Sequence, residues 1–593
     1  MGRRDKRDSR FGLVELGLPG VYNRTARRPG AVARRRGISV TDLAGLNRAP
    51  DDDARRRRRQ LFGVMAATLA YCGVLLAWTI GTSPTVGDES YHYQRAVSYF
   101  EAPLPDPRTT CDSSYPPDGP LAMSYWDAYL WHLALAILWK MLDHPSFLAA
   151  QIYHLAYCFV LGVFTYLAGR RVYGHRGGLL AWALVLTVPM TILFSTVFYI
   201  EVPFLAATAV TVYMVCRASW LGFGLGLAAM FLMRAQSASV LAAPLVVAAW
   251  LALGANLRER LRRLAMAAGV WVAAMLPDML WRWKHFGALL IARPPDNPLR
   301  MQLMAQLPPG EWSVPTSLFD PATSVQMLGL TGAFILVLAL VLAVGALWHS
   351  GRQLLHASPG QGPAIPDLSA WAFALPLVTY VGAYAVFLRG LYDVRYLYPA
   401  TLFAALLAGG CLACQTGLGR AGGRLAWKRA AAWLIALAMA GQFLTVPYVV
   451  RKRRLLPTPV REAFAWIREH TPPRARVLYL EYNLRTETGR PIVWTAAAPR
   501  YLFSVPERDQ ARLLYLLGVE YIAVHPTRLS DPPSPLAEPT AYPRAWVRSL
   551  ARRPYLTLVY PPSGVAAEGE FLIYRIDADR LPHDWIADVT RIP

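Results

Sequence analysis

Four clusters of ionisable and polar residues stand at or near the ends of apolar segments in this chain of 593 residues. An ionisable group at the centre of a membrane helix costs about 2.5–3.5 kcal/mol, so it usually faces a polar cavity or a partner. Carboxylates and arginines together suit displacement at a sugar carbon attached to a phosphate. A carboxylate takes the proton of an acceptor hydroxyl, and arginines bind the departing phosphate. The clusters are Asp88 and Glu89 with His92, Glu201 in "FYIEVPF", Arg234 with Gln236 in "FLMRAQSAS", and Asp393 with Arg395 in "YDVRYLYP".

The first cluster offers two acids side by side. Neighbouring carboxylates do not ionise independently, so one of Asp88 and Glu89 could act as a base while the other stays charged to orient a substrate or bind a metal. Asp88 and His92 are four residues apart and would share a helix face, which could bind a divalent ion. The sequence defines no third ligand, so no cofactor is certain and a divalent metal ion remains open.

Each cluster also has a structural interpretation. Acids favour the first turn of a helix because of the macrodipole, and buried opposite charges often pair. The structural alternatives are a helix start for Asp88 and Glu89, an ion pair for Glu201 and Arg234, a loop cap for Asp393 and Arg395, and a packing role for His92. Their joint arrangement on one side of a membrane is what favours a functional site.

The apolar composition predicts a polytopic α-helical membrane protein. Hydrophobic residues make up 54% of the chain, and about eleven stretches of roughly 20 mainly apolar residues lie between Leu61 and Val450. Residues 1–60 hold 17 Arg or Lys against 7 Asp or Glu and end in "ARRRRRQ" before the first span. This tail is predicted to be cytoplasmic and to contact anionic membrane lipids. It lacks the pattern of aromatic residues interleaved with basic ones that single-strand binders use, which disfavours nucleic acid.

With a cytoplasmic N-terminus, residues 61–450 form a membrane bundle whose four polar clusters all face the extracytoplasmic side. The basic loops "GRRVYGHRGG", "CRAS" and "NLRERLRR" then fall inside. The apolar stretch 220–253 is too long for one span, so it is predicted to divide at Arg234. The first extracytoplasmic loop, 81–146, carries an aromatic-rich segment that is predicted to lie at the membrane interface. Two groups of basic residues fall on the exterior and are exceptions to the rule that basic loops are cytoplasmic: "RKRR" at 451–454, and Arg389 with Arg395.

A change of composition marks the C-terminal part of the chain. "VREAFAWIREH" has the period of an amphipathic helix, whereas "ARVLYLEY", "VEYIAVH", "LTLVY" and "EFLIYRI" are typical of strands. Residues 451–593 are therefore predicted to form a small extracytoplasmic α/β domain. It contains no glycine-rich phosphate loop, nucleophile elbow or metal-ligand spacing.

These motifs resemble the GT-C superfamily of polytopic glycosyltransferases, which includes protein O-mannosyltransferases and the lipid A aminoarabinose transferase. The shared features are an acidic pair after the first span, the Pro116–Pro117 element in "YPPDGPL", an acid on the second exterior loop and a late Arg-Tyr element. "AFAWIREHTPPRARVL" and "LLGVEYIAV" are similar to C-terminal segments of bacterial members. "DESYH", "FYIEV", "MRAQS" and "DVRYL" are similar to parts of the dolichyl-phosphoglucose-dependent alpha-1,2-glucosyltransferase.

The resemblance implies a polyprenyl-phosphate sugar donor, with Asp88 as the base and Glu201 as a second acid. We therefore expect an inverting sugar transfer on the extracytoplasmic face of the cell membrane, to a hydroxyl of a lipid, glycan or protein. Glu89 would support the reaction, and Arg234 and Arg395 would hold the donor phosphate. The alternative is a transporter or flippase of lipid-linked glycans. Transporters usually place polar sites near the midplane between repeated halves, and this chain shows no internal repeat.

Overall fold

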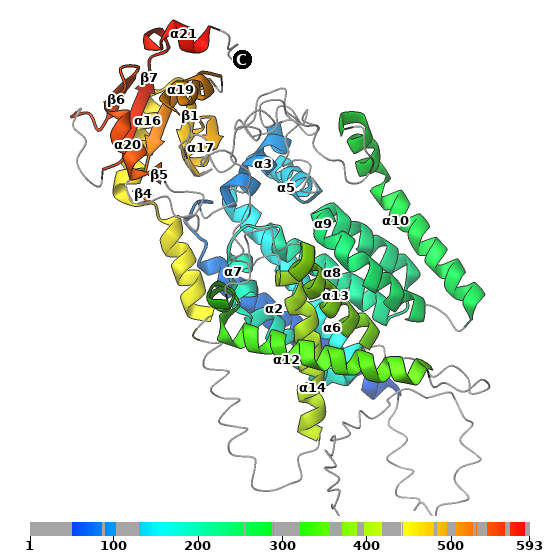
Figure 1. Cartoon of the computed structure of the whole chain (residues 1–593). Helices are drawn as coiled ribbons and strands as arrows, with labels where there is room; N and C mark the ends of the chain where they lie inside the picture. The colour runs from blue at the N-terminus through cyan, green and yellow to red at the C-terminus, as the bar shows by residue number, and fades with distance from the viewer. Residues whose placement is uncertain are drawn as a thin grey trace, which may run out of the picture.

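In the computed structural model, a helical bundle is joined to a small mixed sheet (Figure 1). The structure describes residues 50–85, 89–101, 130–252, 256–286, 289, 321–355, 370–387, 397–417, 441–479 except 442, 483–494, 506–516, 518–525, 529–530, 542–563 and 570–587. The helices of the bundle and its loops are α2 Pro50–Ala77, α3 Glu89–Glu101, α5 Leu130–Leu142, α6 Phe147–Thr187, α7 Pro189–Thr196, α8 Glu201–Cys216, α9 Trp220–Ala252, α10 Leu257–Phe286, α12 Pro321–Leu355, η2 Ala370–Ala374, α13 Leu375–Phe387 and α14 Tyr398–Gly417.

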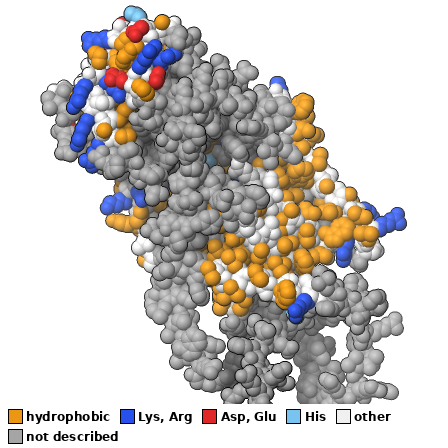
Figure 2. All heavy atoms as spheres, viewed as in Figure 1, with side chains coloured by type: hydrophobic (Ala, Val, Ile, Leu, Met, Phe, Trp, Pro, Cys, Tyr) orange, Lys and Arg blue, Asp and Glu red, His pale blue; other side chains and the backbone are white. Residues whose placement is uncertain are grey.

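Several of these helices suit a membrane. Within the described ranges, five helices are long and apolar enough to cross one, or six if the bent pair α7–α8 is one span. Large apolar side chains are exposed on α10 and α12, including Leu280, Val341 and Trp348. Figure 2 shows a broad apolar surface over the part of the bundle where α10 lies, with Lys and Arg side chains at its margins. The chain is a multi-pass membrane protein by these features.

The longest helix, α6, is two antiparallel helices joined at Gly174. Gly174 has φ 78° and ψ −175°, a conformation that a residue with a Cβ rarely adopts. A Cβ on Gly169 would lie 3.1 Å from the Cα of Gly178, and one on Gly162 would lie 3.3 Å from Leu186 Cδ1. In a straight helix, residues 162 and 186 would be about 36 Å apart. The chain therefore reverses within 169–178, the segment predicted to be a basic loop between two spans.

The apolar stretch 220–253 is also interrupted, at the predicted residue. Arg234 has an extended conformation (φ −157°, ψ 87°) between the two helical parts of α9. The first part packs antiparallel on α8, since a Cβ on Gly226 would lie 3.1 Å from the Cα of Thr211. This pairing brings Arg234 to the end of the bundle where α8 begins.

The two ends of the bundle are formed by different segments of the chain. At one end, Arg170 donates to Arg57 O at 3.5 Å and Arg171 donates to Cys216 O at 3.4 Å, so segments from three predicted cytoplasmic regions meet there. At the opposite end lie the start of α3, the start of α8 and the helical segment 443–454, which leads into the sheet domain (Figure 1). We refer to this opposite end as the domain-side end.

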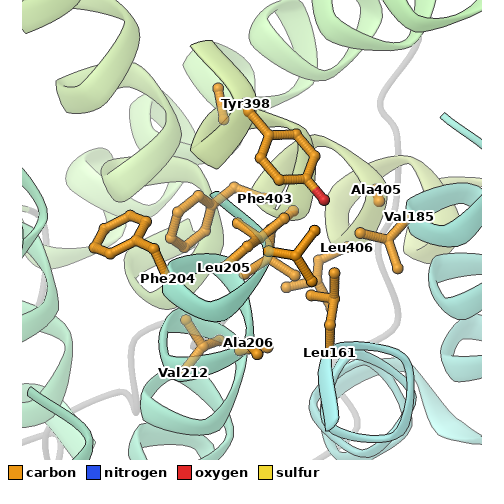
Figure 3. Packing of buried hydrophobic residues seen from close by; sticks show 14 of the residues in the cluster. Leu161, Val185, Phe204, Leu205, Ala206, Val212, Tyr398, Phe403, Ala405 and Leu406 are labelled. Carbon is orange, nitrogen blue, oxygen red and sulfur yellow. The ribbon is translucent and has the colours of Figure 1, made fainter. Parts of the chain in front are cut away.

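Small residues let the central helices approach closely, as is usual for helix packing in membranes. A Cβ on Gly409 of α14 would lie 2.6 Å from Ala181 N of α6. Figure 3 shows the apolar contact of α6, α8 and α14, in which the Tyr398 ring lies close to the aliphatic side chains. The labelled residues are Leu161, Val185, Phe204, Leu205, Ala206, Val212, Tyr398, Phe403, Ala405 and Leu406.

The C-terminal sheet has the order β2-β1-β3-β7-β6. β1 pairs in parallel with β2 and β3, whereas β7 is antiparallel to β3 and β6. Apolar clusters cover both faces, as expected for a sheet whose central strands are buried. The elements are α16 Thr458–His470, β1 Arg476–Tyr479, α17 Asn483–Thr488, β2 Ile492–Trp494, α19 Glu507–Leu516, β3 Val519–Val524, β4 Leu529–Ser530, β5 Tyr542–Pro543, α20 Arg544–Leu550, β6 Leu556–Tyr560, β7 Leu572–Ile576, η5 Ala578–Arg580 and α21 His583–Ile586.

Candidate active site

Five of the predicted site residues are described by the structure, and all five come from the domain-side half of the bundle. They are Glu89, His92, Glu201, Arg234 and Gln236. The remaining three, together with the Pro-Pro element, lie outside the described residues: Asp88, Asp393, Arg395, Pro116 and Pro117.

Glu89 is the first residue of α3, and its carboxylate is completely buried. Oε1 accepts hydrogen bonds from Phe198 N at 2.8 Å and from Gln151 Nε2 at 3.3 Å. Arg454 binds both carboxylate oxygens, through Nη2 to Oε1 and through Nε to Oε2 at 3.1 Å. A carboxylate with this many charge-assisted and backbone donors is held in one orientation.

Arg454 is itself buried at the end of the helical segment 443–454. Its Nη2 also donates to Thr196 O at 2.6 Å, and its guanidinium lies 5.2 Å from the centre of the Phe147 ring. Removing one partner of a buried ion pair costs about 3–5 kcal/mol, because the other charge is left buried without a counter-charge. The pair therefore joins α3 to the last helical segment of the bundle.

Glu201 and Arg234 form a second buried acid–arginine pair. Arg234 Nη1 lies 3.1 Å from Glu201 Oε1, with side-chain exposures of 8% and 2%. Glu201 is the first residue of α8, where the helix dipole favours a negative charge. Arg234 lies at the break of α9, so it reaches Glu201 from a point where the helix is interrupted. Gln236, two residues further on, is half-buried.

The turn 197–200 between α7 and α8 connects the two pairs. The helices on either side are bent by 119°, and the turn ends directly before Glu201. Phe198 donates its amide to Glu89, and the Tyr199 ring lies 5.9 Å from the His92 ring. Both ion pairs therefore adjoin one four-residue turn at the domain-side end.

His92 pairs with a histidine from the neighbouring helix α5. His92 Nδ1 and His132 Nε2 are 3.1 Å apart, and the two rings are stacked with centres 5.3 Å apart. Burial, with smaller effects of Arg95 and His92, lowers the pKa of His132 well below 6.5. Arg95 donates to the Tyr91 hydroxyl at 2.7 Å. His92 is therefore packed among aromatic side chains and a second histidine.

The donor set for a metal ion is incomplete among the residues that the structure describes. They contain no group of three His, Cys, Asp or Glu side chains that could hold a metal. The predicted Asp88–His92 pair includes a residue outside those ranges, so a divalent metal stays a prediction.

Sequence analysis did not assign three side chains of this site. Gln151 and His132 are polar residues on apolar helices, and isolated residues of this kind carry no distinctive pattern. Arg454 could have been suspected, because "RKRR" at 451–454 was an exception to the predicted charge distribution. Asp278 on α10 is a further buried acid that the sequence analysis did not single out.

No family model and no curated relative matches the chain. Solved structures of membrane enzymes do match its fold. ArnT from Cupriavidus metallidurans bound to undecaprenyl phosphate has a TM-score of 0.51 at 14% identity, over 86% of this chain and 97% of that one. The Archaeoglobus fulgidus oligosaccharyltransferase tethered to an acceptor peptide has a TM-score of 0.52 at 14% identity, over 88% of this chain and 74% of that one. The chain therefore shares its fold with these two solved structures.

Proposed function

We propose that this protein is an integral membrane glycosyltransferase that moves a sugar from a polyprenyl-phosphate donor to a hydroxyl of a lipid, glycan or protein. The observation that carries the proposal is the convergence of two buried acid–arginine pairs on the turn 197–200 in a GT-C fold. Structural ion pairs alone would not need to gather at one end. That ArnT binds undecaprenyl phosphate and the oligosaccharyltransferase an acceptor peptide supports the two substrate classes.

In this mechanism Asp88 is the base. It directly precedes Glu89, whose carboxylate is held by Arg454, Gln151 and the Phe198 amide. An anchored neighbour restricts where Asp88 can place its own carboxylate, and a positioned base contributes about 10²–10⁴-fold to the rate. Asp88 takes the proton as the acceptor oxygen attacks the anomeric carbon, and the bond from that carbon to the phosphate oxygen breaks. A single displacement of this kind inverts the configuration.

Arginines hold the leaving phosphate as its charge develops. Glu201 orients the Arg234 guanidinium at 3.1 Å, and a planar guanidinium binds phosphate oxygens in a fixed geometry. Arg395 is the second candidate. Tyr398, three residues after it in the chain, packs with its ring 5.2 Å from the Phe194 ring, close to the turn that adjoins both ion pairs. Gln236 and Asp393 would support these arginines, and Glu201 would also act as the second acid.

The basic segments that meet at one end of the bundle support the proposed sidedness of the site. Arg57, Arg170 and Arg171 gather at the end opposite to Glu89 and Glu201, which supports a cytoplasmic N-terminal tail and an extracytoplasmic site. We propose about eleven spans in total, because α6 and α9 are each divided by a non-helical residue and the shorter apolar helices α13 and α14 coincide with two further predicted spans. The C-terminal domain would then be extracytoplasmic.

The test is turnover by the purified protein in liposomes containing anionic lipid. A panel of undecaprenyl-phosphate sugars is supplied, and release of undecaprenyl phosphate is measured with and without hydroxyl acceptors. We expect Asp88→Asn to abolish release, whereas Glu101→Gln, which removes an exposed acid at the other end of α3, retains it. Full turnover by Asp88→Asn would refute the base assignment. Movement of an intact donor across the bilayer without release would favour the flippase.

A further inference from the structure

We propose that Arg454 is a positioning residue that holds Glu89, the neighbour in sequence of the proposed base Asp88, in place for the reaction. The proposal rests on the proposed function, because it concerns the base of that reaction. It assigns a role to a residue that lies 365 positions from Glu89 in the sequence, beyond the helices that supply the other candidate residues.

Arg454 contacts the chain on both sides of Asp88. Thr85 Oγ1 donates to Arg454 O at 3.4 Å, and the Glu89 carboxylate binds Arg454 Nε and Nη2. Thr85 and Glu89 are four residues apart, and Asp88 lies between them in the sequence. One residue therefore limits the position of both ends of this short segment.

The helical segment that carries Arg454 is fastened at a second point. Arg451, one turn earlier, donates through Nη1 to Trp78 O and Ile80 O, each at 3.1 Å. These carbonyls lie just after the end of α2. The two arginines thus connect one helical turn to the last residues of the first predicted span and to the first residue of α3.

The C-terminal domain also contacts α3. Tyr91 is buried in an apolar cluster with Phe464 of α16 and Phe571, and Gln94 Nε2 donates to Thr486 Oγ1 at 3.2 Å. α16 begins four residues after Arg454. The C-terminal domain and the Arg454–Glu89 pair therefore both restrict the position of α3. In Figure 1 the segment before α16 runs from the bundle directly into the sheet domain.

Arg454 uses two of its three guanidinium nitrogens to bind Glu89. Nε and Nη2 both bind Glu89, and Nη2 also binds Thr196 O. A guanidinium that spans both carboxylate oxygens restricts rotation as well as position, which a lysine ammonium does not. We therefore expect the geometry of Arg454, in addition to its charge, to be required.

The experiment compares Arg454→Lys, Arg454→Gln and the control Arg453→Gln in the full-length protein in liposomes. Arg453 is exposed, so its variant removes the same charge one position away. Each protein is tested for release of undecaprenyl phosphate from the donor panel and for binding of undecaprenyl phosphate itself. We expect Arg454→Gln to lower kcat by about 100-fold, the effect of a misplacement near 1 Å. Arg454→Lys should recover part of the loss, and the Kd for undecaprenyl phosphate should stay as in the wild type and in Arg453→Gln.

Two results would overturn the proposal. If Arg454→Gln and Arg454→Lys keep wild-type kcat, the segment does not need this support. If the Kd weakens in parallel with the loss of kcat, Arg454 binds the phosphate and is not a positioning residue.

Hydrogen exchange provides a readout that does not depend on activity. Phe198 N donates to the Glu89 carboxylate, so loosening of Glu89 should accelerate exchange at Phe198 and along 89–101 in both Arg454 variants, but not in Arg453→Gln. Unchanged exchange would overturn the proposal even if no donor is turned over. If the wild-type protein neither releases nor binds undecaprenyl phosphate while the Arg454 variants show the expected faster exchange, only the proposed function is refuted. Arg454→Lys keeps the test decisive if Arg454→Gln does not fold.

Discussion

Replacement of Glu201 by Gln should reveal how strongly the second ion pair is coupled. In the native protein the Arg234 guanidinium lies 3.1 Å from the Glu201 carboxylate, and their side chains are 8% and 2% exposed. Glutamine has nearly the same shape, but it removes the negative charge and can turn N–H donors toward Arg234. The arginine is then a buried cation without its counter-charge, for which we expect a loss of about 3–5 kcal/mol in the free energy of unfolding.

The assay is denaturant titration of the protein in detergent, followed by tryptophan fluorescence. The control is Glu259→Gln, which breaks the exposed pairs of Glu259 with Arg262 and Arg263 on α10. Water screens these surface charges, so this variant should unfold close to the wild-type denaturant concentration.

A double-mutant cycle separates coupling from two independent losses. Combining Glu201→Gln with Arg234→Gln removes both charges, so the double variant should be no less stable than either single variant. Additive losses would show that the two side chains do not stabilise each other. A midpoint for Glu201→Gln equal to that of Glu259→Gln would refute the reasoning from burial.

Two further predictions concern stability. Gly174→Ala should destabilise the protein by about 1–2 kcal/mol, because φ is 78° there; Gly269→Ala, in a helix with open space around it, should not. A wild-type midpoint for Gly174→Ala would contradict the reversal at this residue. Burial, then the charges of Arg95 and His92, lowers the pKa of His132 below 6.5. The unfolded chain then binds the extra proton first, so the melting temperature should fall as the pH decreases through 6.5 toward the folded-state pKa. His132→Phe should flatten this dependence, and an unchanged slope would contradict it.

Much of the bundle could be predicted because apolar length and charge distribution are local properties of the chain. The break in the stretch 220–253 was predicted at Arg234, since a charge near the middle of a long apolar segment is costly there. The reversal in "GRRVYGHRGG" followed from a basic segment between two apolar ones, although the structure replaces the expected loop with a single non-helical glycine, Gly174. Strands β1, β3, β6 and β7 matched the predicted segments because their patterns are equally local.

The candidate site could be predicted only in part. Glu201 and Arg234 were considered as a pair, because both interrupt apolar helices, and the structure brings them into contact. The partner of Glu89 was not predicted. An acid and an arginine separated by 365 positions leave no spacing that a sequence pattern can detect. The basic exception at 451–454 indicated only that those residues needed an explanation.

By itself, the sequence determined that this protein is a polytopic membrane protein, where its apolar helices break and which acids and arginines are available for chemistry. These properties follow from transfer of side chains between water and lipid, which depends on composition over short stretches. Only the tertiary structure decided which charges meet. Contact between α3, the turn 197–200 and Arg454 depends on how distant helices pack, and a buried charge takes whichever partner the packing brings within hydrogen-bonding distance.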